Sequence, residues 1–403
     1  MLVLRAVGIV CEYNPFHRGH LYQIEESRRR LGEDTAVVCA MSGDFVQRGE
    51  AAIFDKFTRA EAACRCGADL VIELPLPWCL SSAEGFARGA VSMLGAMGCS
   101  ALCFGSESGA LAPLERLAEL AVDPAFNGRV KARLEREPNL SYAAARQLEA
   151  EAAVGEAAKL LEKPNDILAV EYLKAIRTLG LPMRALPVLR KGSGHDRDAL
   201  DGETRSASEI RRRMAAGLPV EDDIPAAAYA VYKREAERGR AVLSGAALET
   251  AMLSRLLLLE GEDFSRLPDA ADGLGNRIYR AVRENAGLEA ICAAAKTKRY
   301  ALSRIRRLCL CACLGVKAGM SAGTPPYARV LAADGKGRAY LHERSAEGTI
   351  PVITRPAAVR MLGADSAALF ALGARAHDFH CLACGRGDRV IPDEDWRRGP
   401  TLV

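Results

Sequence analysis

The sequence contains neither a long apolar segment nor a secretory leader. No apolar run approaches the roughly 20 residues that a membrane-spanning helix needs, which argues against an integral membrane protein. The first apolar stretch, residues 1–10, carries Arg5 and is followed at once by Glu12, so it is too short and too soon charged for a signal peptide. We therefore expect a cytoplasmic protein whose chain begins with a buried strand.

Excess charge and regularly spaced cysteines are also lacking. The 55 Lys and Arg residues nearly balance the 51 Asp and Glu residues, and the net charge of +4 does not by itself indicate nucleic-acid binding. The 13 cysteines are odd in number and irregularly spaced, which disfavours a disulfide framework and favours a reducing compartment. Several lie inside apolar runs, where a free thiol behaves as a small hydrophobe. These are Cys39, Cys99, Cys103, Cys309, Cys311 and Cys313.

The first half of the chain alternates between apolar strands and helices. Its 403 residues, 49% of them hydrophobic, suffice for about two domains with buried cores. Strands are expected over residues 3–10, 36–41, 70–74, 101–104 and 183–189, and helices over residues 19–31, 55–66, 81–97, 165–179 and 209–216. Strands joined by single helices form right-handed parallel crossovers, so we predict a doubly wound α/β sheet.

The second half shows little strand pattern. Helices are expected over residues 225–237, 246–259, 275–285, 288–292 and 303–314. We place a boundary at residues 217–223. This divides the chain into a catalytic α/β domain over residues 1–217 and a mainly α-helical domain over residues 218–403.

The motif that carries chemistry follows the first strand directly. Residues 12–20 read Glu-Tyr-Asn-Pro-Phe-His-Arg-Gly-His, which places His17 and His20 where a strand ends and a helix begins. Open α/β sheets bind ligands at this edge, and a helix N-terminus favours anions. Both imidazoles can point the same way, Gly19 leaves room for a nucleotide beside the backbone, and Pro15 fixes the turn. A polar loop with two histidines is the alternative, but the position of this loop favours ATP binding.

A second motif begins the helix expected at residues 209–216. Residues 206–211 read Ser-Ala-Ser-Glu-Ile-Arg, a capping box followed by a basic side chain. The Ser208 hydroxyl, the helix N–H groups and the Arg211 guanidinium would suit phosphates, whereas an ordinary capped surface helix is the alternative. His-x-Gly-His after a first strand resembles the nucleotidylyltransferase superfamily, and the second motif is similar to that superfamily's Ser-Ser-Thr-x-Ile-Arg signature.

Longer motifs narrow this resemblance. They lie at residues 8–17, 41–50, 55–56, 68–75, 104–107, 163–168 and 190–192. In this order they resemble the bacterial tRNA(Met) cytidine acetate ligases. The similarity is dense over residues 1–215 and returns at residues 296–307.

The resemblance implies a fold, a reaction and a set of site residues. It implies a nucleotidyltransferase-like domain that binds ATP with Mg²⁺, forms acetyl-adenylate, and acetylates the exocyclic amine of the wobble cytidine of elongator tRNA(Met). His17 and His20 would be catalytic, helped by Arg190. The ATP-binding residues would be Val10, Cys11, Glu12, Tyr13, Asn14, Pro15, Phe16, His17, Arg18, Gly19, His20, Leu21, Tyr22, Gln23, Gly105, Asn165 and Arg190, together with Ser208 and Arg211 of the second motif. Asn165 is also a candidate helix N-cap after Pro164.

A basic run indicates where RNA would bind. Residues 296–307 carry six basic side chains and no acid, and the resemblance suggests a tRNA stem-loop as the partner. Tyr300 offers a stacking surface within the run, and residues 211–213 would extend the basic surface towards the active site. A solvated helix face is the alternative. The candidate tRNA-binding residues are Lys296, Lys298, Arg299, Arg304, Arg306 and Arg307.

Three further groups have no firm assignment. His377, His380, Cys381 and Cys384 resemble half a zinc site, but a second well-spaced pair is lacking, so we expect no metal there. The loop residues Ser42, Asp44, Gln47 and Arg48 are candidates for an acyl pocket. The turn at residues 192–195 is a candidate for movement over bound ligand.

Two other functions remain open from the sequence. One is an adenylyltransferase acting on a small phosphorylated metabolite, which leaves the basic helical region unexplained. The other is a non-catalytic RNA-binding protein that retains a nucleotide-binding shell, against which the presence of both histidines argues.

Overall fold

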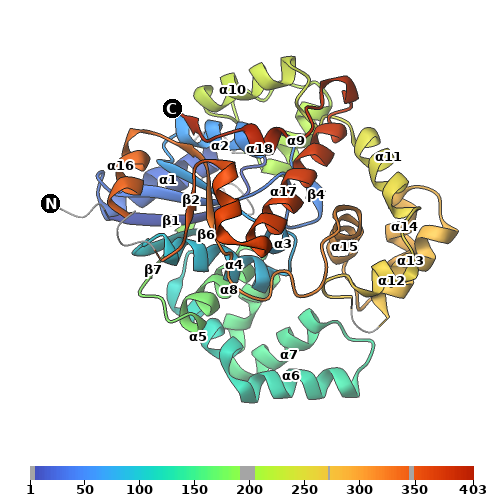
Figure 1. Cartoon of the computed structure of the whole chain (residues 1–403). Coiled ribbons are helices and arrows are strands. Elements are labelled where there is room, and N and C mark those ends of the chain that lie inside the picture. Colours follow the sequence, from blue (N-terminus) through green and yellow to red (C-terminus); the bar gives the residue numbers. More distant parts are fainter. Residues whose placement is uncertain (1–4, 191–204, 271–272, 345–348) are drawn as a thin grey trace.

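The computed structural model describes residues 5–190, 205–270, 273–344 and 349–403 (Figure 1). The predicted turn at residues 192–195 and the start of the first predicted strand lie outside these ranges. No described helix is both long and apolar enough to cross a membrane. All 13 cysteines are free thiols, and all but Cys381 and Cys384 are buried.

One large sheet organises the molecule, with strand order β10-β8-β5-β2-β1-β6-β7 and with β9 paired to β8. Its five central strands are mutually parallel, which confirms the predicted doubly wound sheet. They are β1 (Ala6–Cys11), β2 (Ala36–Ser42), β5 (Leu70–Leu74), β6 (Ala101–Ser106) and β7 (Arg184–Leu189). Every residue of β2 and β5 is buried, as expected of strands covered on both faces.

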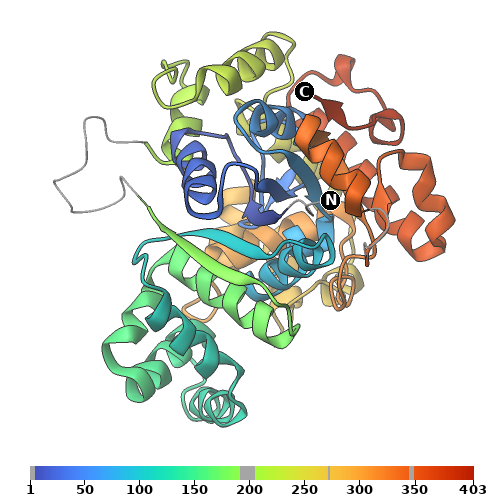
Figure 2. The same ribbon diagram turned by 90° about the vertical axis from the view of Figure 1, so that its left-hand side faces the viewer.

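Helices cover both faces of the sheet (Figure 2). On one face, side chains of β1 and β2 pack with those of α1 (Arg18–Leu31), α2 (Lys56–Arg65) and α10 (Ala226–Glu237). On the other face, the alternate side chains pack with α4 (Ala83–Ala96) and α8 (Pro164–Thr178). The predicted strands and helices of this region agree with the observed ones to within a few residues.

Three helices between β6 and α8 escaped prediction. They are α5 (Leu111–Val122), α6 (Pro124–Arg136) and α7 (Tyr142–Val154), followed by the 3₁₀ segment η1 (Gly155–Glu162). They project from the body of the molecule at the bottom of Figures 1 and 2. Two short strands, β3 (Phe45–Val46) and β4 (Glu50–Ala51), form a hairpin after β2, and α3 (Leu76–Cys79) follows β5.

The C-terminal half is mainly helical, but it also extends the sheet. No individual strand was predicted after residue 217, and β8 (Ala328–Ala333), which is fully buried and pairs antiparallel with β5, was missed. Periodicity could not reveal it, since a short run buried on both faces has no alternation. The other two strands are β9 (Val352–Ile353) and β10 (Thr401–Leu402). The domain boundary near residue 217 stays a prediction, although both main core clusters contain residues from either side of it.

The remaining helices lie as follows. They are α9 (Ala207–Ala215), α11 (Gly245–Leu256), α12 (Gly261–Ser265), α13 (Leu274–Glu284), α14 (Leu288–Ala295), α15 (Leu302–Leu314), α16 (Gly335–Arg344), α17 (Ala364–Ala383) and α18 (Glu394–Arg397), with the 3₁₀ segments η2 (Pro356–Leu362) and η3 (Gly387–Arg389).

Gly337 allows a direct test of how α16 packs beside β5. A Cβ atom on Gly337 would lie 1.9 Å from the carbonyl oxygen of Asp69, whereas a Cβ atom on Gly335 of the same helix would meet nothing within 4 Å. We expect Gly337→Ala to lower the free energy of unfolding in urea by about 1–3 kcal/mol, because the extra methyl group overpacks the contact. Gly335→Ala should stay within about 0.5 kcal/mol of the parent protein. Equal effects of the two substitutions would contradict this packing.

Candidate active site

The loop after β1 is fixed by contacts to distant parts of the chain. It turns through Tyr13, whose φ is 45°, and through a cis peptide bond between Asn14 and Pro15. The Asn14 side chain accepts a hydrogen bond from the Ile53 amide at 2.8 Å, and the Phe16 amide donates to the Tyr232 hydroxyl at 2.9 Å. The chain therefore enters α1 in a defined direction.

The two histidines cap α1 reciprocally. His17 is the N-cap residue, and its Nδ1 accepts a hydrogen bond from the Gly19 amide at 3.0 Å. The His17 amide in turn donates to Nδ1 of His20 at 3.2 Å. The two rings are stacked, with centroids 3.9 Å apart and an interplanar angle of 28°. The capping requirement of the helix thus sets the orientation of both imidazoles.

These contacts fix the tautomer of each ring. A neutral imidazole whose Nδ1 accepts a hydrogen bond carries its proton on Nε2. Burial, together with the positive charge of Arg190, lowers the pKa of His17 to about 4. Burial and the neighbouring His17 hold the pKa of His20 well below its usual range. Neither Nε2 has a hydrogen-bond partner in the part of the chain that the structure describes, so two N–H donors remain for a ligand.

Gly19 and the helix N-terminus have other roles than those predicted. A Cβ atom on Gly19 would lie 2.8 Å from Cε1 of His17, so glycine makes room for the histidine ring. The Gly19 amide is already bonded to that ring, and the Arg18 amide donates to the carbonyl oxygen of Asp223 at 3.0 Å. These first amides of α1 are therefore occupied, and the donors left for an anion are the imidazole Nε2–H groups.

Across from the histidines, β6, α8 and Arg190 meet. The Arg190 side chain lies against Gly105, where a Cβ atom would be 3.4 Å from its Cγ. Its Nη1 donates to Oδ1 of Asn165 at 3.3 Å. Asn165 is not the N-cap of α8, because Lys163 holds that position. The structure thus brings Gly105, Asn165 and Arg190 together as predicted, and Arg190 is close enough to lower the pKa of both histidines.

Glu107 organises this side of the site, and its role was not predicted. Its carboxylate accepts hydrogen bonds from the amides of Asn165, at 3.2 Å, and Asp166, at 2.9 Å, at the start of α8. It also accepts one from the Asn165 side chain at 2.6 Å. The motif at residues 104–107 was noticed in the sequence, but nothing there indicated that Glu107 would cap a helix 58 residues away.

The second motif reaches the same loop. Ser206 caps α9 through the Glu209 amide, which agrees with the predicted cap. Arg211 donates from Nη1 to the carbonyl oxygen of Asn14 at 2.8 Å, and its Nη2 lies 3.3 Å from Oε2 of Glu50. Ser208 is exposed, and its hydroxyl lies 3.1 Å from that of Ser206. Arg211 therefore supports the loop that precedes His17.

The predicted ATP-binding stretch divides into two groups of side chains. Those that are buried are Cys11, Tyr13, Asn14, Pro15, Phe16 and the cap residue His17. Those that are at least partly exposed are Val10, Glu12, Arg18, Gly19, His20, Leu21, Tyr22 and Gln23. Gln23 donates to the Cys103 carbonyl oxygen on β6 at 3.2 Å. Glu12 accepts from the Gln47 amide at 2.8 Å, and burial raises its pKa.

Two of the four residues that were candidates for an acyl pocket, at the end of β2 and in the loop after it, have structural roles. Ser42 is fully buried, and the buried carboxylate of Asp44 pairs with Lys56 and with His377 of α17. Gln47 donates to the Ser81 carbonyl oxygen at 3.1 Å. Arg59 is also fully buried, and it donates to the Glu12 carbonyl oxygen at 2.5 Å. It donates as well to the carbonyl oxygens of Ser42, at 3.2 Å, and of Gly43, and so ties the loops after β1 and β2 together.

The basic run is only partly a surface. Lys296, Lys298, Arg299 and Arg306 are exposed, and Arg304 is half-buried. Arg307 is 7% exposed and lies 3.8 Å from Asp269, so it is poorly placed to bind RNA. Tyr300 is also 7% exposed, and the guanidinium groups of Arg299 and Arg304 lie over its ring, so it offers no stacking surface.

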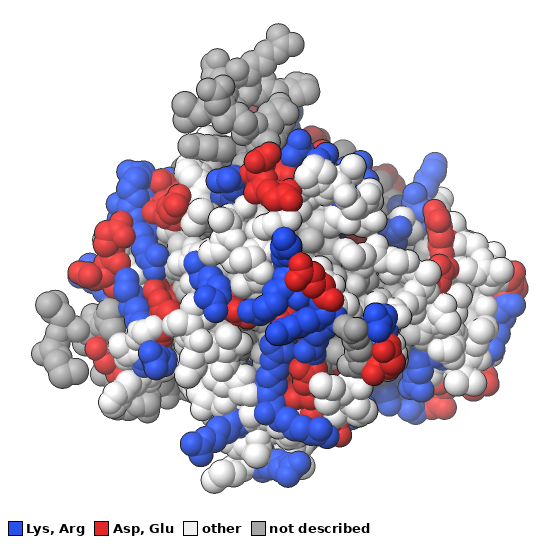
Figure 3. Space-filling model, turned by 90° about the horizontal axis from the view of Figure 1, so that it is seen from above, with Lys and Arg blue, Asp and Glu red and all other residues white. Residues whose placement is uncertain are grey.

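A carboxylate links this basic run to the active-site loop. Glu50 in β4 lies 3.3 Å from Arg211 and 4.0 Å from Arg306 of α15. Gly49 packs directly on α15, because a Cβ atom there would lie 2.4 Å from the Arg307 amide nitrogen. Figure 3 shows the molecule from above relative to Figure 1, and on this face Lys and Arg gather in the middle with acidic side chains beside them. Positive charge is thus concentrated locally although the net charge is small.

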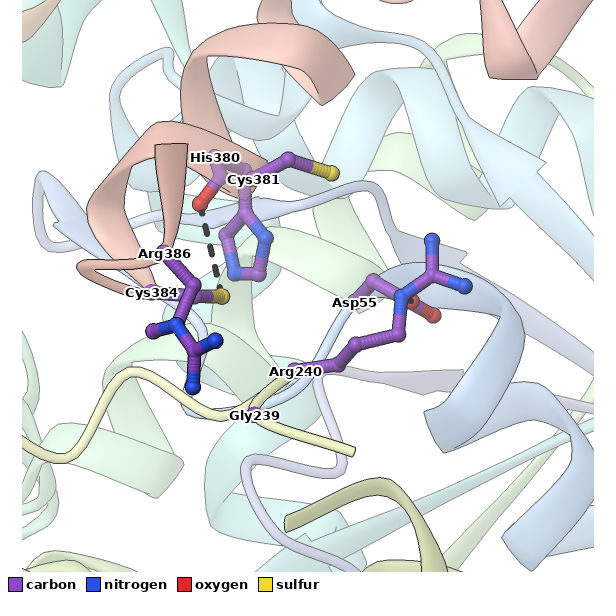
Figure 4. Close-up of a pocket in the computed structure, with 7 residues that line it drawn as sticks. All are labelled: Asp55, Gly239, Arg240, His380, Cys381, Cys384 and Arg386. Carbon is purple, nitrogen blue, oxygen red and sulfur yellow. Dashed lines mark hydrogen bonds and ion pairs between the residues drawn. The ribbon is translucent and has the colours of Figure 1, made fainter. Parts of the chain in front are cut away.

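The four His and Cys residues near the C-terminus belong to the core rather than to a loose tail. His377 and His380 lie on α17 and are fully buried. Cys384 directs its thiol to the His380 carbonyl oxygen (Figure 4). Sγ of Cys381 instead lies 3.7 Å from Nε2 of His377. The Cys-x-x-Cys pair therefore does not converge on one point.

Comparison with known proteins agrees with this geometry. Residues 4–388 match the HIGH nucleotidyl transferase family, the class that a parallel sheet with paired histidines after β1 defines. The tRNA(Met) cytidine acetate ligase of Syntrophotalea carbinolica is 38% identical over 87% of this chain and 85% of its own. That of Caldanaerobacter subterraneus is 35% identical over 94% of this chain and 96% of its own. The chain belongs to the tRNA(Met) cytidine acetate ligase family.

Solved structures show the same fold. The apo structure of Thermotoga maritima TmcAL has a TM-score of 0.92 at 29% identity and covers 99% of this chain and 100% of the other. A second structure of that protein, bound with alpha-thio ATP, has a TM-score of 0.90 at 28% identity with the same coverage.

The protonation of His17 is directly measurable. We expect NMR titration of its Cε1–H resonance to give a pKa of about 4, and a non-hydrolysable ATP analogue to raise it, because phosphate favours the imidazolium. Since the unfolded chain binds more protons between pH 4 and 6.5, the stability that His17 contributes is lost as the pH falls through that range. Loss of the resonance in His17→Asn protein assigns it to His17. A pKa near 6.5 in the free protein would contradict the buried, capped geometry.

Proposed function

We propose that this protein activates acetate with ATP as acetyl-adenylate and transfers the acetyl group to the exocyclic amine of the wobble cytidine of elongator tRNA(Met), giving N4-acetylcytidine. The observation that carries the proposal is the pair of stacked, neutral histidines beside Arg190 at the carboxyl end of β1. Membership in a family named for this activity supports it.

The first step needs alignment and charge stabilisation rather than a base. Acetate is already an anion, so its oxygen can attack the α-phosphorus directly, and pyrophosphate leaves. The Nε2–H groups of His17 and His20 donate to the phosphate oxygens, and the Arg190 guanidinium offsets the charge that develops on pyrophosphate. Asn165 holds Arg190 in place at 3.3 Å.

The second step explains why the acid must be activated. The lone pair of the cytidine exocyclic amine is delocalised into the ring, which makes the amine a poor nucleophile. The amine attacks the acetyl carbonyl carbon, AMP leaves, and the amine loses one proton. A cytosine stacked inside a folded anticodon loop cannot reach the acyl group in the active site. The wobble nucleotide therefore has to be splayed out of the loop.

Mg²⁺ would enter with the triphosphate. The carboxylate of Glu107 already accepts hydrogen bonds from α8 on both oxygens, so it is not a ready ligand. We expect phosphate oxygens and water to hold the ion, as is usual for Mg²⁺ at nucleotide sites. None of the steps above requires a protein side chain to coordinate the Mg²⁺ ion.

The tRNA would lie across α15 and the hairpin after β2. Lys296, Lys298, Arg299 and Arg306 present positive charge, and Glu50 connects Arg306 to Arg211 beside the histidine loop. A tRNA backbone that follows this surface would lead from the basic side chains to the active site. The continuity favours a tRNA modification over an adenylyltransferase for a small metabolite.

Substitutions at His17 separate its capping role from its catalytic role. Asn can cap a helix but supplies no Nε2–H donor. We expect His17→Asn to lower kcat for acetylation of tRNA with labelled acetate by about 10²–10³-fold while preserving stability, because a donor to the transition state is lost. His17→Ala should show the same loss of activity and also lose about 1 kcal/mol of stability.

The same assay separates the alternatives. His342→Ala, on α16, is the control histidine substitution and should leave the rate unchanged. Pyrophosphate release that requires a phosphorylated metabolite instead of acetate would identify an adenylyltransferase. Binding of tRNA without any ATP turnover would identify a non-catalytic RNA-binding protein. Full activity of His17→Asn would overturn the assignment of the histidines.

The tRNA surface is testable through salt dependence. We expect combined substitution of Lys296, Lys298 and Arg299 by Ala to weaken tRNA binding and to reduce the slope of log K against log salt by about 0.7–0.9 for each lost phosphate contact. Substitution of Arg129, Lys131 and Arg136 by Ala, three exposed basic residues on α6, provides the charge-matched control. If the control variant loses as much affinity as the first, tRNA binds elsewhere.

A further inference from the structure

We propose that His377, Cys381 and Glu394 form a zinc-binding site at the junction of α17, α18 and the loop after β2. The three ligand atoms lie within 4.8 Å of one another. This site is separate from the histidine pair at α1, and the proposal does not depend on the function assigned above. It departs from the expectation drawn from the sequence, where Cys-x-x-Cys spacing drew attention to Cys384 and gave no sign of Glu394.

The distances suit a tetrahedral ion. Nε2 of His377 lies 3.7 Å from Sγ of Cys381 and 3.6 Å from Oε2 of Glu394. Zinc bonds of ordinary length at tetrahedral angles place a nitrogen about 3.5 Å from sulfur and about 3.4 Å from oxygen. Sγ of Cys381 and the Glu394 oxygen lie within 4.8 Å of each other, so an ion that binds all three atoms would draw these two together by up to about 1 Å. The mixture of sulfur, nitrogen and oxygen ligands suits Zn²⁺ better than Mg²⁺ or Ca²⁺.

The surroundings of His377 orient it as a ligand. Its Nδ1 lies 3.0 Å from Oδ2 of Asp44, a contact buried on both sides. When Nδ1–H donates to a carboxylate, the lone pair of Nε2 is left for a metal. A carboxylate is the usual hydrogen-bond partner of a zinc-bound histidine. Glu394 is held by Arg398 on Oε1 and by Arg240 on Oε2, so Oε2 would keep one lone pair on Arg240 and offer the other to the ion.

The charge of the buried network is compatible with a dication. The permanent cations linked by ion pairs around this site are Lys56, Arg240, Arg329 and Arg398. The carboxylates in the same network are Asp44, Asp55, Glu73, Glu394 and Asp395. Despite its burial, the contact with Asp44 raises the pKa of His377, and the imidazolium completes the balance of positive and negative charge. Zn²⁺ would displace the Nε2 proton of His377 and the thiol proton of Cys381, so the buried charge stays balanced when the ion binds.

A small pocket lies beside the proposed thiolate ligand. Cys381 lines it, together with Asp55, Arg240, His380 and Cys384 (Figure 4). His380 is fully buried, and its Nδ1 has no hydrogen-bond partner among the described residues. Its Nε2 is occupied by the Ala52 carbonyl oxygen at 2.7 Å. Polar groups thus line the space beside Cys381.

Cys381 and Cys384 form a matched pair for the test. Full-length protein is stripped with a chelator, incubated with Zn²⁺ or Co²⁺ and dialysed. We expect one ion per chain, a thiolate-to-cobalt charge-transfer band, and a rise in Tm with Zn²⁺. Cys381→Ser should abolish the band and the rise in Tm, while Cys384→Ser should retain both, since the Cys384 thiol faces the His380 carbonyl oxygen. Asp44→Asn should weaken zinc binding by about 10–100-fold.

The outcomes decide the proposal. Wild-type protein that retains no zinc after dialysis, or Cys381→Ser protein that binds zinc as tightly as the wild type, would overturn it. Loss of binding in Cys384→Ser with retention in Cys381→Ser would move the site to other residues and would equally contradict it. Because each readout is a metal content, a spectrum or a Tm, the result is independent of acetylation activity.

Discussion

The reciprocal cap at the start of α1 is the constraint on which the active site depends. Nδ1 of both His17 and His20 accepts a hydrogen bond from a backbone amide at the helix start. Both rings are therefore neutral with the proton on Nε2, and they stack on each other. The same two side chains therefore cap the helix through Nδ1 and, in the proposed mechanism, bind the phosphates through Nε2. A side chain that caps equally well but lacks the second ring nitrogen would keep the fold and lose the chemistry.

The rest of the molecule holds this cap at the mouth of the sheet. Arg59 joins the loops after β1 and β2, Arg211 reaches the Asn14 carbonyl oxygen from α9, and Tyr232 of α10 accepts from the Phe16 amide. The C-terminal half contributes strand β8 and a buried ionic network to the other side of the sheet. Segments on both sides of residue 217 thus build one rigid support for the site.

Local features were predictable from the sequence, and long-range ones were not. The strand before the histidines, the start of α1, the cap of α9, and the grouping of Gly105, Asn165 and Arg190 follow from short motifs, whether read directly or through the family resemblance. Strand β8 gave no signal, because a short stretch buried on both faces lacks periodicity. Arg307 and Tyr300 were expected on the surface, yet Asp269 and the packing of α15 bury them. Their burial depends on partners distant in sequence.

The most direct measurement is a crystal structure of this protein with a non-hydrolysable ATP analogue. We expect phosphate oxygens within about 3.2 Å of Nε2 of both His17 and His20, with both Nδ1 contacts to the backbone retained. A nucleotide bound elsewhere, or histidine rings that turn away from the phosphates into the core, would contradict the central role of the paired imidazoles.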